Sequence, residues 1–158
     1  MKIATIAELK QELLHEPPAK LMELCLRLAR FKKENKELLT YLLFEANDVD
    51  VYIQGIKKEM AGHFETINVS NVYFVKKTVR KILRITNKYI RYSGSGIVEV
   101  SLLIHFCALI KSLGPVINEN VVISNIFQNQ VKRITKSIAA MHEDLQYDFL
   151  KELKELYE

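Results

Sequence analysis

Apolar residues recur at helical spacing along nearly the whole chain, and this pattern limits the folds open to it. From Phe127 to Leu145 they repeat at alternating steps of four and three residues, which places one apolar stripe along a helix. No segment of useful length alternates as a half-buried strand would. Only 5 Gly and 3 Pro interrupt the 158 residues, so the sequence predicts an all-α protein.

Prolines and apolar runs predict the first helices. An amphipathic helix over residues 6–14 ends before Pro17, and Pro18 opens the next helix at its first turn. The run LLTYLLFEA, residues 38–46, is apolar nearly all round. A helix of that composition is usually enclosed by other elements, so we expect it to be buried.

Capping residues predict the starts of the central helices: Asp48 or Asp50 for one that extends to about Ile67, and Asn68 or Ser70 for the next. That second helix ends at Gly94, which suits a left-handed C-terminal position. After Pro115, either one long helix bends or two helices meet near residues 141–144.

These elements predict one helical domain over residues 1–158, with six to eight helices in an antiparallel bundle or a stacked helix-hairpin array. The helix over residues 97–113 carries few polar side chains, and Gly114 and Pro115 end it. We expect it to be the central and most buried element. The stripe from Phe127 to Leu145 packs either within the domain or between subunits, so a homo-oligomer is a possible assembly.

Two segments, LARFKKENKELLTYLLFEA (28–46) and KILRITNKYIRYSG (81–94), resemble bacterial helical proteins of unknown function. The resemblance implies an all-helical fold and no particular activity.

The N-terminal segment, the most apolar segment and the two cysteines predict the compartment in which the protein is found. The first residues, MKIATIAELKQELL, lack the continuous apolar region of a signal peptide. The most apolar segment, residues 97–110, is too short to cross a bilayer. Cys25 and Cys107 lie in apolar sequence, which predicts buried thiols in a reducing compartment and leaves a disulfide open. We expect a cytoplasmic protein with no membrane partner.

The charge distribution points to one segment. The net charge is +4, yet residues 66–98 contain 7 basic residues and no Asp or Glu. The remaining residues carry 16 bases and 19 acids. All of the positive excess therefore lies in 33 of the 158 residues.

On a helical wheel, six of these cations fall on one face, which we call the basic strip: Lys77, Arg80, Lys81, Arg84, Lys88 and Arg91. Apolar residues, among them Val75, Val79 and Ile82, take the opposite face. Like charges three and four residues apart cost the isolated helix about 1–2 kcal/mol in total. Three explanations stay open for the strip: acids of residues 142–158 in the same chain or a neighbour pair with it, an anionic partner binds it, or it is a solvated face.

The strip leads into the turn SGSG, residues 93–96, which precedes the next helix. Free N–H groups at a helix N-terminus bind oxyanions, and small residues allow close approach. Ser93 and Ser95 are therefore candidate anion-binding residues beside Lys88 and Arg91. The alternative is a plain turn between two helices.

Catalytic signals are weak. His105 and Cys107 lie two residues apart, and such positions face different ways on a helix. Glu59 and His63 offer two metal ligands, which make no site without others. We expect no metal and no cofactor. The sequence favours a non-catalytic interaction protein that binds nucleic acid or an acidic protein through its basic helix, residues 72–92. A structural homo-oligomer and an enzyme with a phosphate-containing ligand at SGSG are the alternatives.

Overall fold

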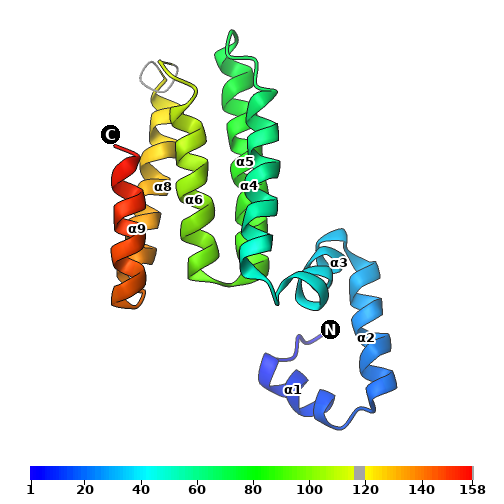
Figure 1. The fold of residues 1–158 in the computed structure, drawn as a ribbon. Coiled ribbons are helices and arrows are strands. Elements are labelled where there is room, and N and C mark those ends of the chain that lie inside the picture. Colours follow the sequence, from blue (N-terminus) through cyan, green and yellow to red (C-terminus); the bar gives the residue numbers. More distant parts are fainter. Residues whose placement is uncertain (116–119, 158) are drawn as a thin grey trace. The chain divides into compact units, whose positions relative to one another are not determined.

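A computed structural model describes residues 1–115 and 120–157 of the chain (Figure 1). The described residues form eight α-helices and one short π-helix, and none of them lies in a β-strand. The prediction of an all-α protein with six to eight helices is confirmed.

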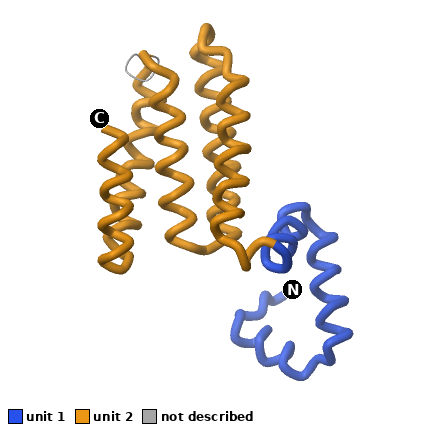
Figure 2. Tube along the Cα trace, in the orientation of Figure 1, with its two compact units in different colours: residues 1–44 blue, residues 45–158 orange. Residues whose placement is uncertain are grey.

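The chain forms two compact units, which we call unit 1 (residues 1–44) and unit 2 (residues 45–158; Figure 2). The expectation of a single domain concerns cooperative folding, which compactness alone does not test. It stays a prediction.

Unit 1 holds three short helices and a π-helical segment that runs one residue beyond it: α1 (Ile6–Leu14), α2 (Pro18–Phe31), α3 (Lys33–Thr40) and η1 (Tyr41–Glu45). A capping box opens α1, where Thr5 N donates to the Glu8 carboxylate at 2.7 Å and Glu8 N donates to Thr5 Oγ1 at 3.3 Å. Pro18 occupies the first turn of α2, as predicted.

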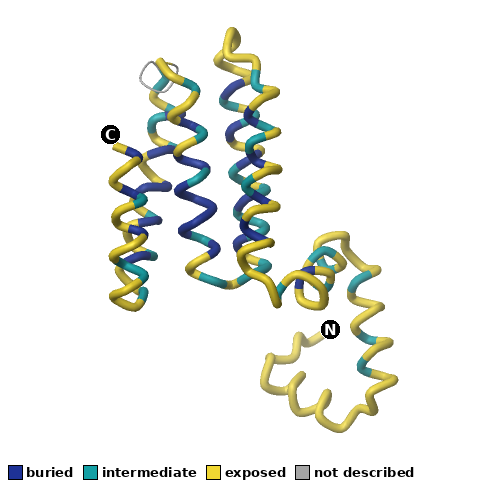
Figure 3. The backbone as a smooth tube through the Cα atoms, in the orientation of Figure 1, coloured by how far each residue is buried: buried dark blue, intermediate teal, exposed yellow. Residues whose placement is uncertain are grey.

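Two expectations for this part of the chain are wrong. Residues 38–46 do not form a buried helix, because Tyr41 alone is buried among residues 1–44, all of which the structure describes. Cys25 is exposed on α2. Apolar composition leads to burial only where another layer covers it, and α2 packs mainly against α3. Figure 3 shows the resulting contrast between the two units.

Unit 2 is a helical bundle whose described helices are α4 (Val49–Glu65), α5 (Val72–Ser93), α6 (Gly96–Lys111), α8 (Val121–Ala139) and α9 (Glu143–Glu155). Consecutive helices run in opposite directions (Figure 1). Helix α6 packs against each of the other four, and most of its residues are buried (Figure 3).

The predicted central helix is therefore confirmed. Leu103 and Phe106 of α6 are completely buried, and the Phe106 ring meets Phe64 edge-on with the ring centroids 6.0 Å apart. Cys107 is a buried free thiol, so of the two cysteines only this one lies in the core.

The C-terminal stripe packs inside unit 2. Its side chains at Phe127, Val131, Ile134 and Ile138 are buried within the chain. Of the two predicted arrangements, the structure shows two helices, because α8 ends at Ala139 and His142 caps the start of α9. This stripe is thus occupied without a second subunit.

Cap positions were predicted with mixed success. Asp48 caps α4, and Gly94 has the left-handed conformation with φ 60°, as expected. The cap of α5 is Asn71 rather than Asn68 or Ser70. Asn68 Oδ1 instead accepts from Ser70 N and Oγ within the turn that precedes α5. Several residues able to cap follow one another here, and local sequence does not choose among them.

We predict that Phe106→Ala lowers the free energy of unfolding by about 3–5 kcal/mol, because it opens a cavity at the centre of unit 2. Ile97→Ala is the matched control on the same helix, since Ile97 is 38% exposed, and it should cost less than about 1 kcal/mol. Urea denaturation followed by circular dichroism measures both. Equal losses for the two variants would contradict the central position of α6.

Candidate anion-binding surface

The rotation of α5 about its axis determines which residues meet solvent. Val75, Val79, Ile82 and Ile90 are buried on one side, as the helical wheel predicted. Thr86 is also fully buried, and its hydroxyl donates to the Ile82 carbonyl at 3.0 Å. With this face fixed in the core, the opposite face must point outward.

The basic strip lies on that outer face. Five of its six members are exposed: Lys77, Arg80, Lys81, Arg84 and Arg91. Lys88 is half-buried, with its ammonium 5.4 Å from the centroid of the Tyr89 ring and 6.0 Å from that of Tyr92. These are cation–π distances, so Lys88 is held against the helix surface.

The exposed strip cations have no ion pair with any described residue. The C-terminal acids, one of the predicted sources of compensation, lie elsewhere in unit 2. Helix α9 packs against α6 and α8, and these helices separate it from α5 (Figure 1). Within one chain, therefore, the structure does not bring the acids of α9 to the strip.

Two shallow grooves follow the strip. The first, of about 530 Å³, is lined by Tyr73, Lys76, Lys77, Arg80, Lys81 and Arg84. The second, of about 480 Å³, is lined by Arg80, Leu83, Arg84, Asn87, Arg91 and Arg133. Arg80 and Arg84 border both, so the grooves form one cationic surface along α5.

Arg133 of α8 is a member of this surface that the sequence did not reveal. Its Nη1 donates to Asn87 Oδ1 at 2.5 Å, and its Nε donates to Glu99 Oε1 at 2.5 Å. Glu99 Oε2 also accepts from Ser137 Oγ at 2.8 Å. Glu99 offsets the charge of Arg133 and fixes its guanidinium beside α5. No spacing along the sequence indicates a contact between residues 46 positions apart.

The tyrosines near the strip divide into two kinds. Tyr89 packs within unit 2, since its ring meets Tyr52 edge-on and its hydroxyl donates to Glu59 at 3.1 Å. Tyr73 is 64% exposed at the start of α5, beside Phe74, which is 52% exposed. Their ring centroids are 5.6 Å apart. Of these two rings, that of Tyr73 lines the cationic groove.

In the SGSG turn, the hydroxyls of Ser93 and Ser95, which we considered for anion binding, form hydrogen bonds within the turn and its flanking helices. Ser93 Oγ donates to the Ile90 carbonyl at 2.9 Å and accepts from Ser95 N at 3.2 Å. Ser95 is the N-cap of α6 and accepts from Val98 N at 3.5 Å. These contacts close α5 and open α6, which is the structural role that the sequence offered as the alternative.

The other candidate groups show no convergent arrangement. His105 Nε2 donates to the Lys57 carbonyl at 3.2 Å, and burial, followed by the charge of Lys57, lowers the pKa of His105. Burial raises the pKa of Cys107 to about 12, so its thiol is protonated at neutral pH. The described residues contain no group of three or more side chains placed to bind a metal ion.

Within the described part of the chain, no helix combines the length and apolar character needed to span a bilayer. Comparison with protein-family models, with curated proteins and with solved structures finds no match to this chain.

We predict that Lys81→Glu stabilises the protein, because it replaces repulsion with Lys77 and Arg84 by attraction at helical spacings of four and three residues. The expected gain is about 0.5–1 kcal/mol, and Lys81→Gln should give roughly half of it. Thermal unfolding measures both variants, and added salt should shrink the differences. A loss of stability on Lys81→Glu would show that an acid already pairs with the strip.

Proposed function

We propose that unit 2 is a non-catalytic binding module whose basic strip binds the phosphate backbone of nucleic acid. One observation carries the proposal: the five exposed cations of the strip follow one face of α5 without an ion pair to any described residue. Cations arranged in this way repel one another, and a polyanion laid along them removes that repulsion.

The dimensions of the strip suit a nucleic-acid strand. From Lys77 to Arg91 the helix rises about 21 Å, at 1.5 Å per residue. Phosphates of one strand follow each other at about 3.4 Å along a duplex, and those of an extended single strand are farther apart, so the strip covers at most about six of them. Arg80 and Arg84 border both grooves. A strand that follows either groove therefore meets the centre of the strip.

The exposed ring of Tyr73 at one end of the groove favours a single strand. Bases of single-stranded nucleic acid stack on aromatic side chains, whereas the bases of a duplex are already stacked on each other. Tyr73 lines the groove together with four members of the strip. Contacts to phosphates carry no sequence information, so binding through the strip should show weak sequence preference.

The strip variant combines Lys77→Glu, Lys81→Glu and Arg84→Glu. We expect it to bind a fluorescent oligothymidine more than about tenfold more weakly than the unmodified protein. The magnitude of the slope of log affinity against log salt concentration should also fall by about two, since three phosphate contacts are lost. Fluorescence anisotropy at several salt concentrations measures both quantities.

A second triple variant controls for net charge, because it reverses three exposed lysines of α8 and α9: Lys132→Glu, Lys136→Glu and Lys151→Glu. Equal loss in both variants would reduce the effect to net charge and contradict a defined strip. Tighter binding of poly-L-glutamate than of the oligonucleotide would identify an acidic protein as the partner instead. No binding of either polymer leaves the strip as a structural feature.

The aromatic contribution is tested separately. Tyr73→Ala should weaken binding to oligothymidine by about 1–3 kcal/mol and leave binding to a duplex of equal length unchanged. Tyr147→Ala is the control, since Tyr147 is 74% exposed on α9 and does not line the groove. If Tyr73→Ala affects the duplex as strongly as the single strand, stacking on this ring is not part of binding.

A further inference from the structure

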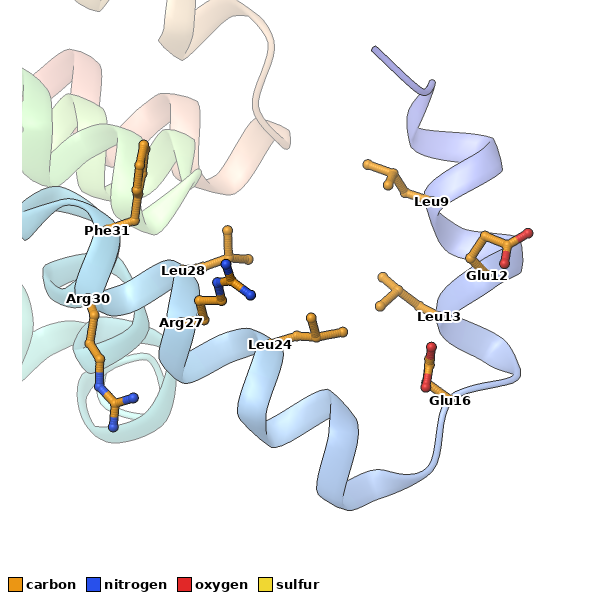
Figure 4. Close-up of a pocket in the computed structure, with 9 residues that line it drawn as sticks. All are labelled: Leu9, Glu12, Leu13, Glu16, Leu24, Arg27, Leu28, Arg30 and Phe31. Carbon is orange, nitrogen blue, oxygen red and sulfur yellow. The ribbon is translucent and has the colours of Figure 1, made fainter. Parts of the chain in front are cut away.

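The grooves of the two units differ in the charges that border them. The groove between α1 and α2 in unit 1 measures about 860 Å³ and is lined by leucines of both helices (Figure 4). Glu12 and Glu16 of α1 and Arg27 and Arg30 of α2 also line it, so its charges favour no ligand of one sign. The second groove along the basic strip, where α5 meets α8, has only cations among its charged lining residues.

Every charged residue that lines this second groove is an arginine. We call it the arginine groove, and its lining residues are Arg80, Leu83, Arg84, Asn87, Arg91 and Arg133. The first groove is lined by three lysines and by the two arginines that it shares with the arginine groove. A guanidinium can donate two parallel hydrogen bonds to a phosphate, whereas an ammonium acts as a point charge. The two grooves therefore suit different phosphate contacts.

The arginines gather around Asn87. Positions 84, 87 and 91 share one face of α5, because they are three and four residues apart. Arg84 lies about 4.5 Å before Asn87 along the helix axis and Arg91 about 6 Å after it, at 1.5 Å per residue. Arg133 reaches the same level from α8, since its Nη1 donates to Asn87 Oδ1. Three guanidinium-bearing side chains from two helices thus border one region of the groove.

Arg133 is held in place by the protein itself. Glu99 accepts from its Nε and Asn87 accepts from its Nη1, while no described residue accepts from its Nη2. The N–H groups of Nη2 therefore remain for a ligand, and a side chain that is already fixed loses little freedom on binding. Glu99 removes one charge, so the four arginines and this carboxylate leave a net charge of +3.

We propose that the arginine groove binds a phosphate monoester at the end of a nucleic-acid strand, while the rest of the strand follows the first groove toward Tyr73. This inference rests on the proposed function, because it names the part of the nucleic acid that meets one end of the strip. Arg91 is the last cation of α5, and residues 92–98 contain no basic residue. The strip therefore stops at the arginine groove, as a bound strand end would.

The charge and shape of a terminal phosphate match this region. A phosphate monoester carries about 1.5–2 negative charges at neutral pH and has three acceptor oxygens. A phosphate within a strand carries one charge. Guanidiniums that approach from α5 and from α8 can each bond a different oxygen of the monoester. The single cations along the first groove instead suit the single charges of internal phosphates.

Three forms of an eight-nucleotide oligothymidine test the inference: one with a phosphate at its 5′ end, one with a phosphate at its 3′ end, and one with neither. Eight nucleotides span the distance from Asn87 to Tyr73, which is about 21 Å along the helix, at 3.4 Å or more per phosphate. One phosphorylated form should bind at least about tenfold more tightly than the unphosphorylated form. Fluorescence anisotropy with the label on an internal base measures all three.

Two single variants separate the arginine groove from net charge. Arg91→Gln and Lys77→Gln each remove one exposed cation of α5, and only Arg91 lines the arginine groove. Both variants should weaken binding of the unphosphorylated form. Arg91→Gln should reduce the preference for the terminal phosphate to about threefold or less, whereas Lys77→Gln should retain it. Equal loss of the preference in the two variants overturns the inference.

The remaining outcomes distinguish this inference from the proposed function. Equal binding of all three oligothymidines, with the strip variant still weaker, overturns the terminal-phosphate site and leaves the proposed function in place. No binding of any oligothymidine overturns both. Thymidine monophosphate represents a free phosphate monoester and should bind at least tenfold more weakly than the preferred oligothymidine, because it cannot reach the first groove. Equal affinity would assign the arginine groove to a small phosphate monoester and overturn the strand end as its ligand.

Discussion

The burial of most of α6 among four other helices is the constraint on which the rest of unit 2 depends. Its side chains cannot be covered by one neighbour, so four helices pack around it. Each of those helices must then turn its apolar face toward α6. Burying a valine or isoleucine side chain of α5 contributes about 1.5–3 kcal/mol. Repulsion along the strip costs about 1–2 kcal/mol in total, so packing determines the rotation of α5 and the cations are left in solvent.

The same comparison explains which features could be predicted from the sequence. The amphipathic pattern of α5, the left-handed Gly94 and the apolar α6 are local signals, and packing reinforces each of them. The fold class and the face of α5 that carries the strip could therefore be predicted from the sequence. The position of Arg133 beside the strip could not be predicted, because Arg133 meets Asn87 only through the packing of α8 beside α5.

The errors have a common physical cause. Cys25 and residues 38–46 were expected to be buried because their neighbours are apolar. Apolar sequence indicates how much free energy a segment would gain from burial. Burial also requires another element that packs against the segment. In unit 2, α6 provides a surface for every neighbouring helix. Unit 1 has no such element, and its leucines border a groove instead of a core.

Each unit thus has an unmatched surface of a different physical kind, and this determines what can complete it. The strip has an excess of one charge over about 21 Å, so the extended anion that we propose would match it along its length, and salt should weaken that contact. The groove of unit 1 combines leucines with charges of both signs, so whatever completes it would be held largely by apolar burial, and salt does not screen that contribution.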